Sequence, residues 1–140
     1  MRIRSLTLIL LFAVGTVAPG FGITVKVASS APENSPWGEA LNQIASEWSE
    51  ISGGEVEMQI FHNAIAGEEE DVVRKMRVGQ IDAGILTTVG LAEIADEIMT
   101  ISTPFLIRSN EEFEYVFEQM KEDFGQAIER RRFNVLGWSR

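Results

Sequence analysis

The chain has 140 residues, 12 of them basic and 21 acidic, and its formal net charge at pH 7 is −9. This acidic balance argues against nucleic acid or an anionic membrane surface as a binding partner. Cysteine is absent, which excludes a disulfide framework and a lipid attached through cysteine. A hydrophobic share of 45% and a charged share of 24% are typical of one ordinary globular domain.

Residues 1–22 have the three parts of a secretory signal peptide. Two arginines precede an apolar run over residues 6–17, and small residues suited to cleavage follow. The run is shorter than the roughly 20 apolar residues of a membrane span, and an uncleaved anchor is the alternative. Removal of this segment leaves 10 basic against 21 acidic residues, a net charge of about −11. We therefore expect an exported, periplasmic protein.

The next part of the chain predicts a strand, a helix and a second strand. Residues 23–29 (ITVKVAS) alternate and are rich in β-branched side chains, as strands are. After a polar loop, apolar residues recur at helical spacing over residues 37–48, and Ser35 followed by Pro36 suits the start of a helix. Residues 55–61 alternate strictly, which predicts the second strand.

A helix and a third strand follow. Residues 68–79 begin with four acidic residues and carry three basic ones near their end, an order that suits the helix dipole. Residues 80–86 (QIDAGIL) form a short apolar stretch typical of a buried parallel strand. Alternating strands and helices predict right-handed βαβ units and an α/β fold with a mostly parallel sheet flanked by helices.

The remaining residues are less regular. We expect a loop or short helix near residues 89–94 and an extended segment from there through Pro104. A helix is predicted to begin at Ser109 or the next residue, and a second helix to follow over residues 122–131. FNVLGW, residues 133–138, predicts another strand.

Signals of catalysis or metal binding are weak. His62 is the only histidine, so a zinc site would have a single nitrogen ligand, and we expect this residue in a surface loop. No serine stands in a G-x-S-x-G context. The acidic run at 68–71 could hold a hard cation, but stabilisation by a helix N-terminus is the simpler explanation. We predict neither a catalytic residue nor a metal or cofactor.

Two loops at the carboxyl ends of predicted parallel strands form the candidate binding site. Ligands of open α/β sheets lie in the crevice beyond these ends, and the loops after the first and third strands both carry compact polar groups. The candidate residues are Ser30, Asn34, Thr87 and Thr88, with Trp37 and Phe105 as apolar walls. The alternatives are ordinary loop capping for the threonines and core packing for the tryptophan.

Five stretches occur in an order that resembles one known family. They are APENSPW, SGGEVEMQIF, RKMRVGQIDAGIL, STPFLIRSNEEF and VLGW, and the likeness extends over residues 23–138. Together they resemble the solute-binding proteins of tripartite ATP-independent periplasmic (TRAP) transporters, the DctP family. Each motif alone is weak, whereas the combination in this order is specific.

The resemblance implies a receptor with two α/β lobes, which binds an organic acid or other small solute between them and delivers it to membrane permease subunits. Residues 23–140 would be the first lobe, like that of a periplasmic binding protein, so the chain would be a fragment that stops near the first crossing into the second lobe. First-lobe contacts would fall at Ala31–Ser35, which adds Ala31 and Glu33 to the candidate residues, and at Thr87–Thr88. A ligand-clamping arginine would lie in the second lobe.

This sequence departs from the family pattern in two places. The usual LG before the acidic helix is replaced by the stretch AIAGEEED. The loop after the third strand, LTTVGLAEI, offers hydroxyl and apolar groups where some acid-binding members carry a charge. The ligand would therefore be less polar or bound mainly by the second lobe. GLAEI and the segment around GQIDAG resemble a branch whose partners can include a helical-repeat periplasmic subunit, and this resemblance puts a dicarboxylate ligand in doubt.

Two other functions stay open at this stage. A secreted interaction module would bind a partner protein through the exposed face of the lobe. An exported hydrolase would need a pair of carboxylates in the cleft, and only Glu33 lies near the predicted edge. A solvated loop charge is the simpler explanation of that residue.

Overall fold

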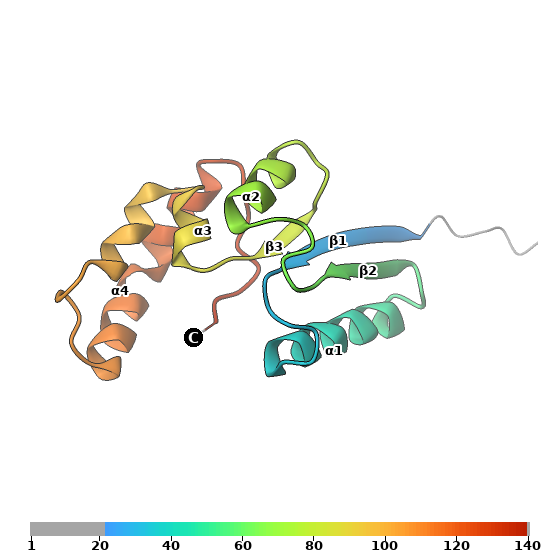
Figure 1. Cartoon of the computed structure of the whole chain (residues 1–140), viewed down its shortest axis with the longest axis horizontal. Helices are drawn as coiled ribbons and strands as arrows, with labels where there is room; N and C mark the ends of the chain where they lie inside the picture. The colour runs from blue at the N-terminus through green and yellow to red at the C-terminus, as the bar shows by residue number, and fades with distance from the viewer. Residues whose placement is uncertain (1–21, 140) are drawn as a thin grey trace, which may run out of the picture.

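The structure, a computed structural model, describes residues 22–139, so nearly all of the predicted signal peptide lies outside the described residues. The elements in chain order are β1 (Ile23–Ser29), α1 (Pro36–Ile51), β2 (Val56–Phe61), α2 (Glu69–Arg77), β3 (Ala83–Ile85), α3 (Thr88–Ala92), the 3-10 helix η1 (Asp96–Ser102) and α4 (Asn110–Glu129). Figure 1 shows the strands between α1 and α2, with α3 and α4 grouped beside them. The predicted α/β fold is confirmed.

The three strands form one parallel sheet in the order β2-β1-β3. Val27 of the central strand pairs with Ile60 on one side and with Ala83 on the other. Because the strands are parallel, their carboxyl ends all lie at the same edge of the sheet. The third strand is shorter than the predicted residues 80–86.

The helices α1 and α2 cover opposite faces of the sheet. The crossover from β1 to β2 runs across the sheet in one direction and that from β2 to β3 in the other, so right-handed connections place the two helices on opposite faces. Figure 1 shows this arrangement. Against α2, a Cβ atom on Gly84 would lie 3.0 Å from Cγ1 of Val72 and 3.3 Å from Sδ of Met76. Glycine therefore allows helix and sheet to approach closely.

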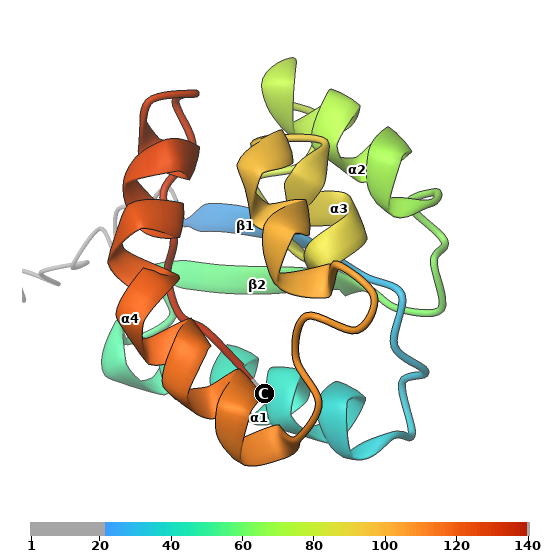
Figure 2. The same cartoon turned by 90° about the vertical axis from the view of Figure 1, so that its left-hand side faces the viewer.

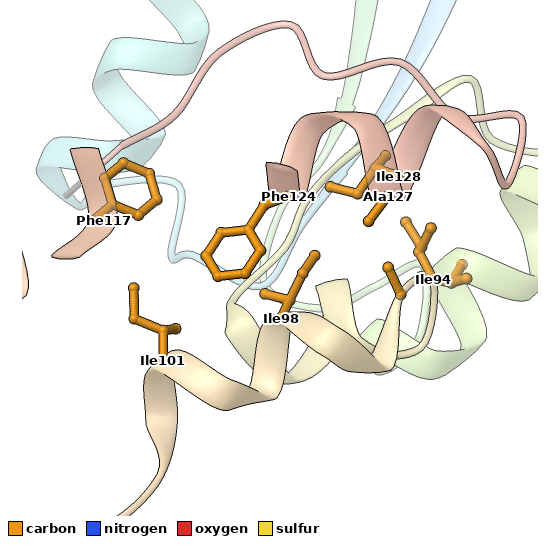
Figure 3. Packing of buried hydrophobic residues seen from close by; sticks show 9 residues of the cluster. Ile94, Ile98, Ile101, Phe117, Phe124, Ala127 and Ile128 are labelled. Carbon is orange, nitrogen blue, oxygen red and sulfur yellow. The ribbon is translucent and has the colours of Figure 1, made fainter. Parts of the chain in front are cut away.

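The larger hydrophobic core lies between η1 and α4 rather than on the sheet. Figure 3 shows its side chains directed toward one another from these two elements and from the turn before η1. Val73 of α2 joins the cluster and thereby connects it to the layer that covers the sheet. Its buried members are Val73, Ile94, Ala95, Ile98, Ile101, Phe117, Phe124, Ala127 and Ile128.

Two predicted elements beyond the sheet are wrong. The expected pair of helices after Ser109 is the single helix α4, because apolar residues keep helical spacing through its whole length and no proline interrupts it. The expected extended segment before Pro104 contains η1 instead. Ile98 lies four residues after Ile94, and Ile101 lies three residues after Ile98. This helical spacing buries one face of the segment against α4.

The strand predicted at residues 133–138 is also wrong. These residues have no regular secondary structure, and Phe133, Val135 and Trp138 pack on the core between η1 and α4. The ring of Trp138 meets that of Phe117 edge to face, with centroids 5.5 Å apart. Figure 2 shows this last segment running back along α4. Within residues 22–139, no helix is both long enough and apolar enough to cross a membrane.

Candidate functional site

The loops after β1 and β2 are joined by main-chain hydrogen bonds at the carboxyl edge of the sheet. The amide of Ala64 donates to the carbonyl of Ser29 at 3.2 Å, and the amide of Asn63 donates to that of Ala31 at 3.1 Å. Asn63 and Ala64 have left-handed backbone angles, with φ of 57° and 54°, which turn the chain back toward β1. The loop after β2 is thus part of the site, although sequence reasoning omitted it.

The loop after β1 is further fixed by its own hydrogen bonds. The hydroxyl of Ser29 accepts from the amide of Ala31 at 3.1 Å. At the other end, the Ser35 hydroxyl donates to the carbonyl of Pro32 at 2.6 Å and accepts from the amide of Gly38 at 3.2 Å. The predicted helix cap at Ser35 is confirmed. Between these anchors the loop presents exposed Ser30, Glu33 and Asn34, with Ala31 half-buried.

The loop after β3 is tied to α2 by one acidic side chain. Oε2 of Glu69 accepts from the amide of Thr87 at 3.0 Å and from its hydroxyl at 2.8 Å. Thr87 precedes α3, yet its hydroxyl makes no capping bond within that helix. Thr88, the first residue of α3, is half-buried. Both threonines lie at the edge predicted for them, and their contact with a ligand stays a prediction.

The two predicted apolar walls lie in different surroundings. Trp37, in the first turn of α1, keeps 50% of its surface exposed, so it is not a core residue. Phe105 is 89% exposed on the turn between η1 and α4, with φ of 67°. The surface hollow beside Phe105 is lined by residues of the segment 101–113, and by none from the loops after β1 and β3. Trp37 thus follows directly on the first loop, whereas the hollow beside Phe105 includes no residue of that loop.

His62 is buried, which corrects the expectation of a surface loop residue. Only 7% of its surface is exposed, because it lies at the end of β2, which α1 covers. Its Nε2 lies 3.2 Å from Oδ1 of Asn42 in α1. Nδ1 has no hydrogen-bond partner among the described residues. This arrangement is structural packing of a histidine beneath the site.

The acidic run at the start of α2 does not converge on a cation. Glu69 reaches across to Thr87, whereas Asp71 pairs with Arg74 on its own helix. Over the described part of the chain, no three acidic or histidine side chains gather as metal ligands would. Sequence reasoning missed Glu69 as a site residue. The signal that could have indicated it is its place as the first residue of the helix that follows the second strand.

Comparison with known proteins identifies the family. The model for "Bacterial extracellular solute-binding protein, family 7" (DctP) matches residues 27–140. A solute-binding protein from Chromohalobacter salexigens is 28% identical over 108 residues, which cover 76% of this chain and 32% of that protein. A solute-binding protein from Roseobacter denitrificans is 25% identical over 78% of this chain and 32% of its own length.

Solved structures show the same fold. A TRAP periplasmic solute-binding protein from C. salexigens with bound D-glucuronate has a TM-score of 0.72 and 26% identity, over 81% of this chain and 38% of that one. The R. denitrificans protein with bound L-galactonate has a TM-score of 0.66 and 25% identity, over 76% and 36% of the two chains.

The match is to one part of these proteins. The chain spans about a third of the length of the curated relatives it matches. Among residues 22–139, the likeness includes β1 from Val27 onward, the rest of the sheet and all the helices. The chain therefore belongs to the DctP family of bacterial extracellular solute-binding proteins, family 7.

Proposed function

We propose that this chain is the first lobe of an extracytoplasmic receptor of the TRAP type, which binds a small organic solute against a second lobe. The observation that carries the proposal is the wall built by the loops after β1 and β2, which main-chain hydrogen bonds from Asn63 and Ala64 hold together. A wall that is already ordered loses little conformational entropy when a ligand binds. This favours capture of a solute at the sheet edge.

The ligand class we propose is a sugar acid. Structures of similar proteins from C. salexigens and R. denitrificans hold D-glucuronate and L-galactonate, both of which combine several hydroxyls with one carboxylate. The edge loops of this chain, residues 30–35, 62–67 and 86–88, offer hydroxyl and amide groups and the carboxylate of Glu33, and contain neither lysine nor arginine. This wall would therefore bind the hydroxyl-bearing part of the ligand, and the second lobe its acid group.

The mechanism would be capture without chemistry. A ligand that touches both lobes stabilises the closed state, and its differential affinity for the closed over the open state sets the population shift. The closed receptor would then deliver its solute to membrane permease subunits. Because the sequence resembles one branch of the family, a helical-repeat periplasmic subunit would be a further partner. Residues 1–22 would act as the signal peptide for export.

The intact mass of the natural mature protein, extracted from the cell envelope, tests the proposal. A mass more than twice the 15.6 kDa of this chain is expected, because a second lobe must be present for closure. A mass below 15.6 kDa would mean that the lobe exists alone, and the receptor mechanism would then fail.

Titration calorimetry on residues 23–140 tests the need for the second lobe. With D-glucuronate we expect weak or undetectable binding, because half of the ligand contacts would be absent. Micromolar affinity of the isolated lobe would contradict the two-lobe mechanism. The same titration on the natural mature protein should give clear saturation.

An interaction module is the second candidate, and one observation favours it. The apolar face of α1 carries four side chains that stay 38% to 84% exposed, which is a feature of surfaces that another protein covers. They are Trp37, Ile44, Trp48 and Ile51. A mature protein that consists of this lobe alone, monodisperse and cooperatively folded, would support this candidate over the receptor.

A further inference from the structure

We propose that Glu69 is a positioning residue that makes Thr87 a hydrogen-bond acceptor for the ligand, and that it thereby selects ligand hydroxyls over a second carboxylate at this wall. The inference rests on the proposed function, because it concerns the same site. Glu69 acts through Thr87 and need not touch the ligand itself.

The Thr87 hydroxyl is directed at the carboxylate of Glu69. Its proton is donated to Oε2 of Glu69 at 2.8 Å, and the amide of Thr87 donates to the same oxygen at 3.0 Å. A hydroxyl has only one proton, so once it is donated the oxygen presents lone pairs alone. Bonds to a carboxylate are stronger than those between neutral groups, which keeps the proton directed at Glu69. Thr87 is exposed, so these lone pairs are open to a ligand.

Packing against α3 holds Glu69 in this position. Gly90 of α3 is buried against the side chain of Glu69. A Cβ atom on Gly90 would lie 2.2 Å from Oε2 of Glu69 and 2.9 Å from its Cβ. Only glycine leaves room for the carboxylate to pass α3 and reach Thr87. The contact between Glu69 and Thr87 is therefore built into the packing of α2 on α3.

The Thr87 oxygen, once its proton is donated, discriminates between ligand groups. An oxygen that only accepts will bind a hydroxyl of the ligand, which can donate, and will not bind a carboxylate, which cannot. The negative charge of Glu69 directly behind Thr87 also repels an anionic group at this position. A sugar acid with one carboxylate can turn a hydroxyl toward Thr87, whereas a sugar with an acid group at each end is disfavoured.

Hydrogen exchange of the Thr87 amide tests the contact itself. In Glu69→Ala we expect the amide to exchange about fivefold faster than in the unaltered chain, which is the contribution of one hydrogen bond. Gly90→Ala should act in the same direction, because it displaces Glu69. Glu70→Ala is the matched control, since Glu70 is the exposed next residue of the same helix. Equal rates in the Glu69 and Glu70 variants would overturn the inference.

Ligand selectivity of the natural mature protein tests the role. The probes are D-glucuronate and D-glucarate, which has a second carboxylate in place of the sugar aldehyde. We expect Glu69→Gln to reduce the preference for D-glucuronate over D-glucarate by about fivefold, since it removes the charge and keeps the shape. Glu70→Gln, with the same loss of charge, should leave this ratio unchanged.

The outcomes separate the inference from the proposed function. If Glu69→Gln and Glu70→Gln both bind D-glucuronate and prefer it over D-glucarate by the same ratio, the role of Glu69 is overturned. The receptor function would still stand. If the unaltered protein binds neither probe, the proposed sugar-acid receptor is wrong, and the role of Glu69 in selecting its ligand is overturned with it.

Discussion

Gly38 in the first turn of α1 lies directly against the loop that precedes this helix. A Cβ atom on Gly38 would come within 2.2 Å of the carbonyl oxygen of Glu33 and 2.5 Å of that of Pro32. The loop after β1 can therefore fold back over the helix start only because residue 38 has no side chain. One wall of the candidate site depends on this close approach.

Gly38→Ala is expected to destabilise the protein by at least about 1 kcal/mol, because the loop carbonyls would have to move. Alanine is the better helix former by about the same amount, so propensity alone predicts the opposite sign. Urea denaturation monitored by circular dichroism measures the difference in unfolding free energy. The matched control is Gly125→Ala in α4, where a Cβ atom would have no neighbour within 4 Å.

The control should stabilise the protein by up to about 1 kcal/mol, as expected for a helix interior without steric conflict. Stabilisation by both variants would show that the loop does not pack on Gly38 as described. Destabilisation by both would point to a role for Gly125 that its surroundings do not explain.

Asn42→Ala should destabilise the protein by about 1–3 kcal/mol. Its side-chain oxygen lies 3.2 Å from Nε2 of buried His62, and removal would leave that nitrogen buried without a partner. The control is Gln43→Ala, because Gln43 bonds Glu47 on the exposed side of the same helix at 2.8 Å. A change within about 0.5 kcal/mol is expected there. Equal losses in the two variants would contradict a specific contact with His62.

The elements set by local signals could be predicted from the sequence. Ser35 and Pro36 mark the start of α1, and Ser35 bonds the amide of Gly38 as a capping residue should. The charge order along residues 68–79 likewise indicated α2. Because these signals act over three or four residues, they do not depend on how distant parts of the chain pack.

Features that arise from distant contacts could not be predicted in this way. His62 is buried by a helix whose Asn42 is 20 residues away, and Glu69 meets Thr87 across 18 residues. Residues 133–138 have the composition of a strand, but their apolar side chains are taken up by the core between η1 and α4. A strand pattern requires a partner edge, and the sequence alone does not show which surface takes the apolar side chains.

Ile128→Val should cost about 0.5–1.5 kcal/mol of stability, the usual loss for one methyl group in a packed core. Ile128 is 2% exposed and lies among the side chains shown in Figure 3. The same substitution at Ile51, which is 84% exposed, is the control and should change stability by less than about 0.5 kcal/mol. Thermal unfolding of both variants gives the comparison. An equal effect at the two positions would mean that the core does not lie between η1 and α4.

Stability at low pH should depend on Glu97. Hydrogen bonding to its backbone amide at the start of η1, with further bonds to Asp96 and Arg131, holds the pKa of Glu97 below its usual 4.5. A carboxyl group whose pKa is lower in the folded than in the unfolded chain stabilises the fold at pH values above its unfolded pKa. This contribution is lost as the pH falls through the pKa of the folded chain. The unaltered protein should therefore lose stability as the pH falls below about 4.5.

Glu97→Gln should reduce the drop in Tm between pH 7 and about pH 3.5, because glutamine does not take up this proton. The pKa of Glu111 is lowered for a separate reason, namely its backbone amide and the side chain of Ser109 at the start of α4. Glu111→Gln should thus reduce the drop independently, and the two effects should add. An unchanged drop in Glu97→Gln would mean that the contacts at the start of η1 do not favour its ionised form. Since Arg131 joins this carboxylate to the end of α4 at 3.1 Å, such a result would also question how η1 and α4 are held together.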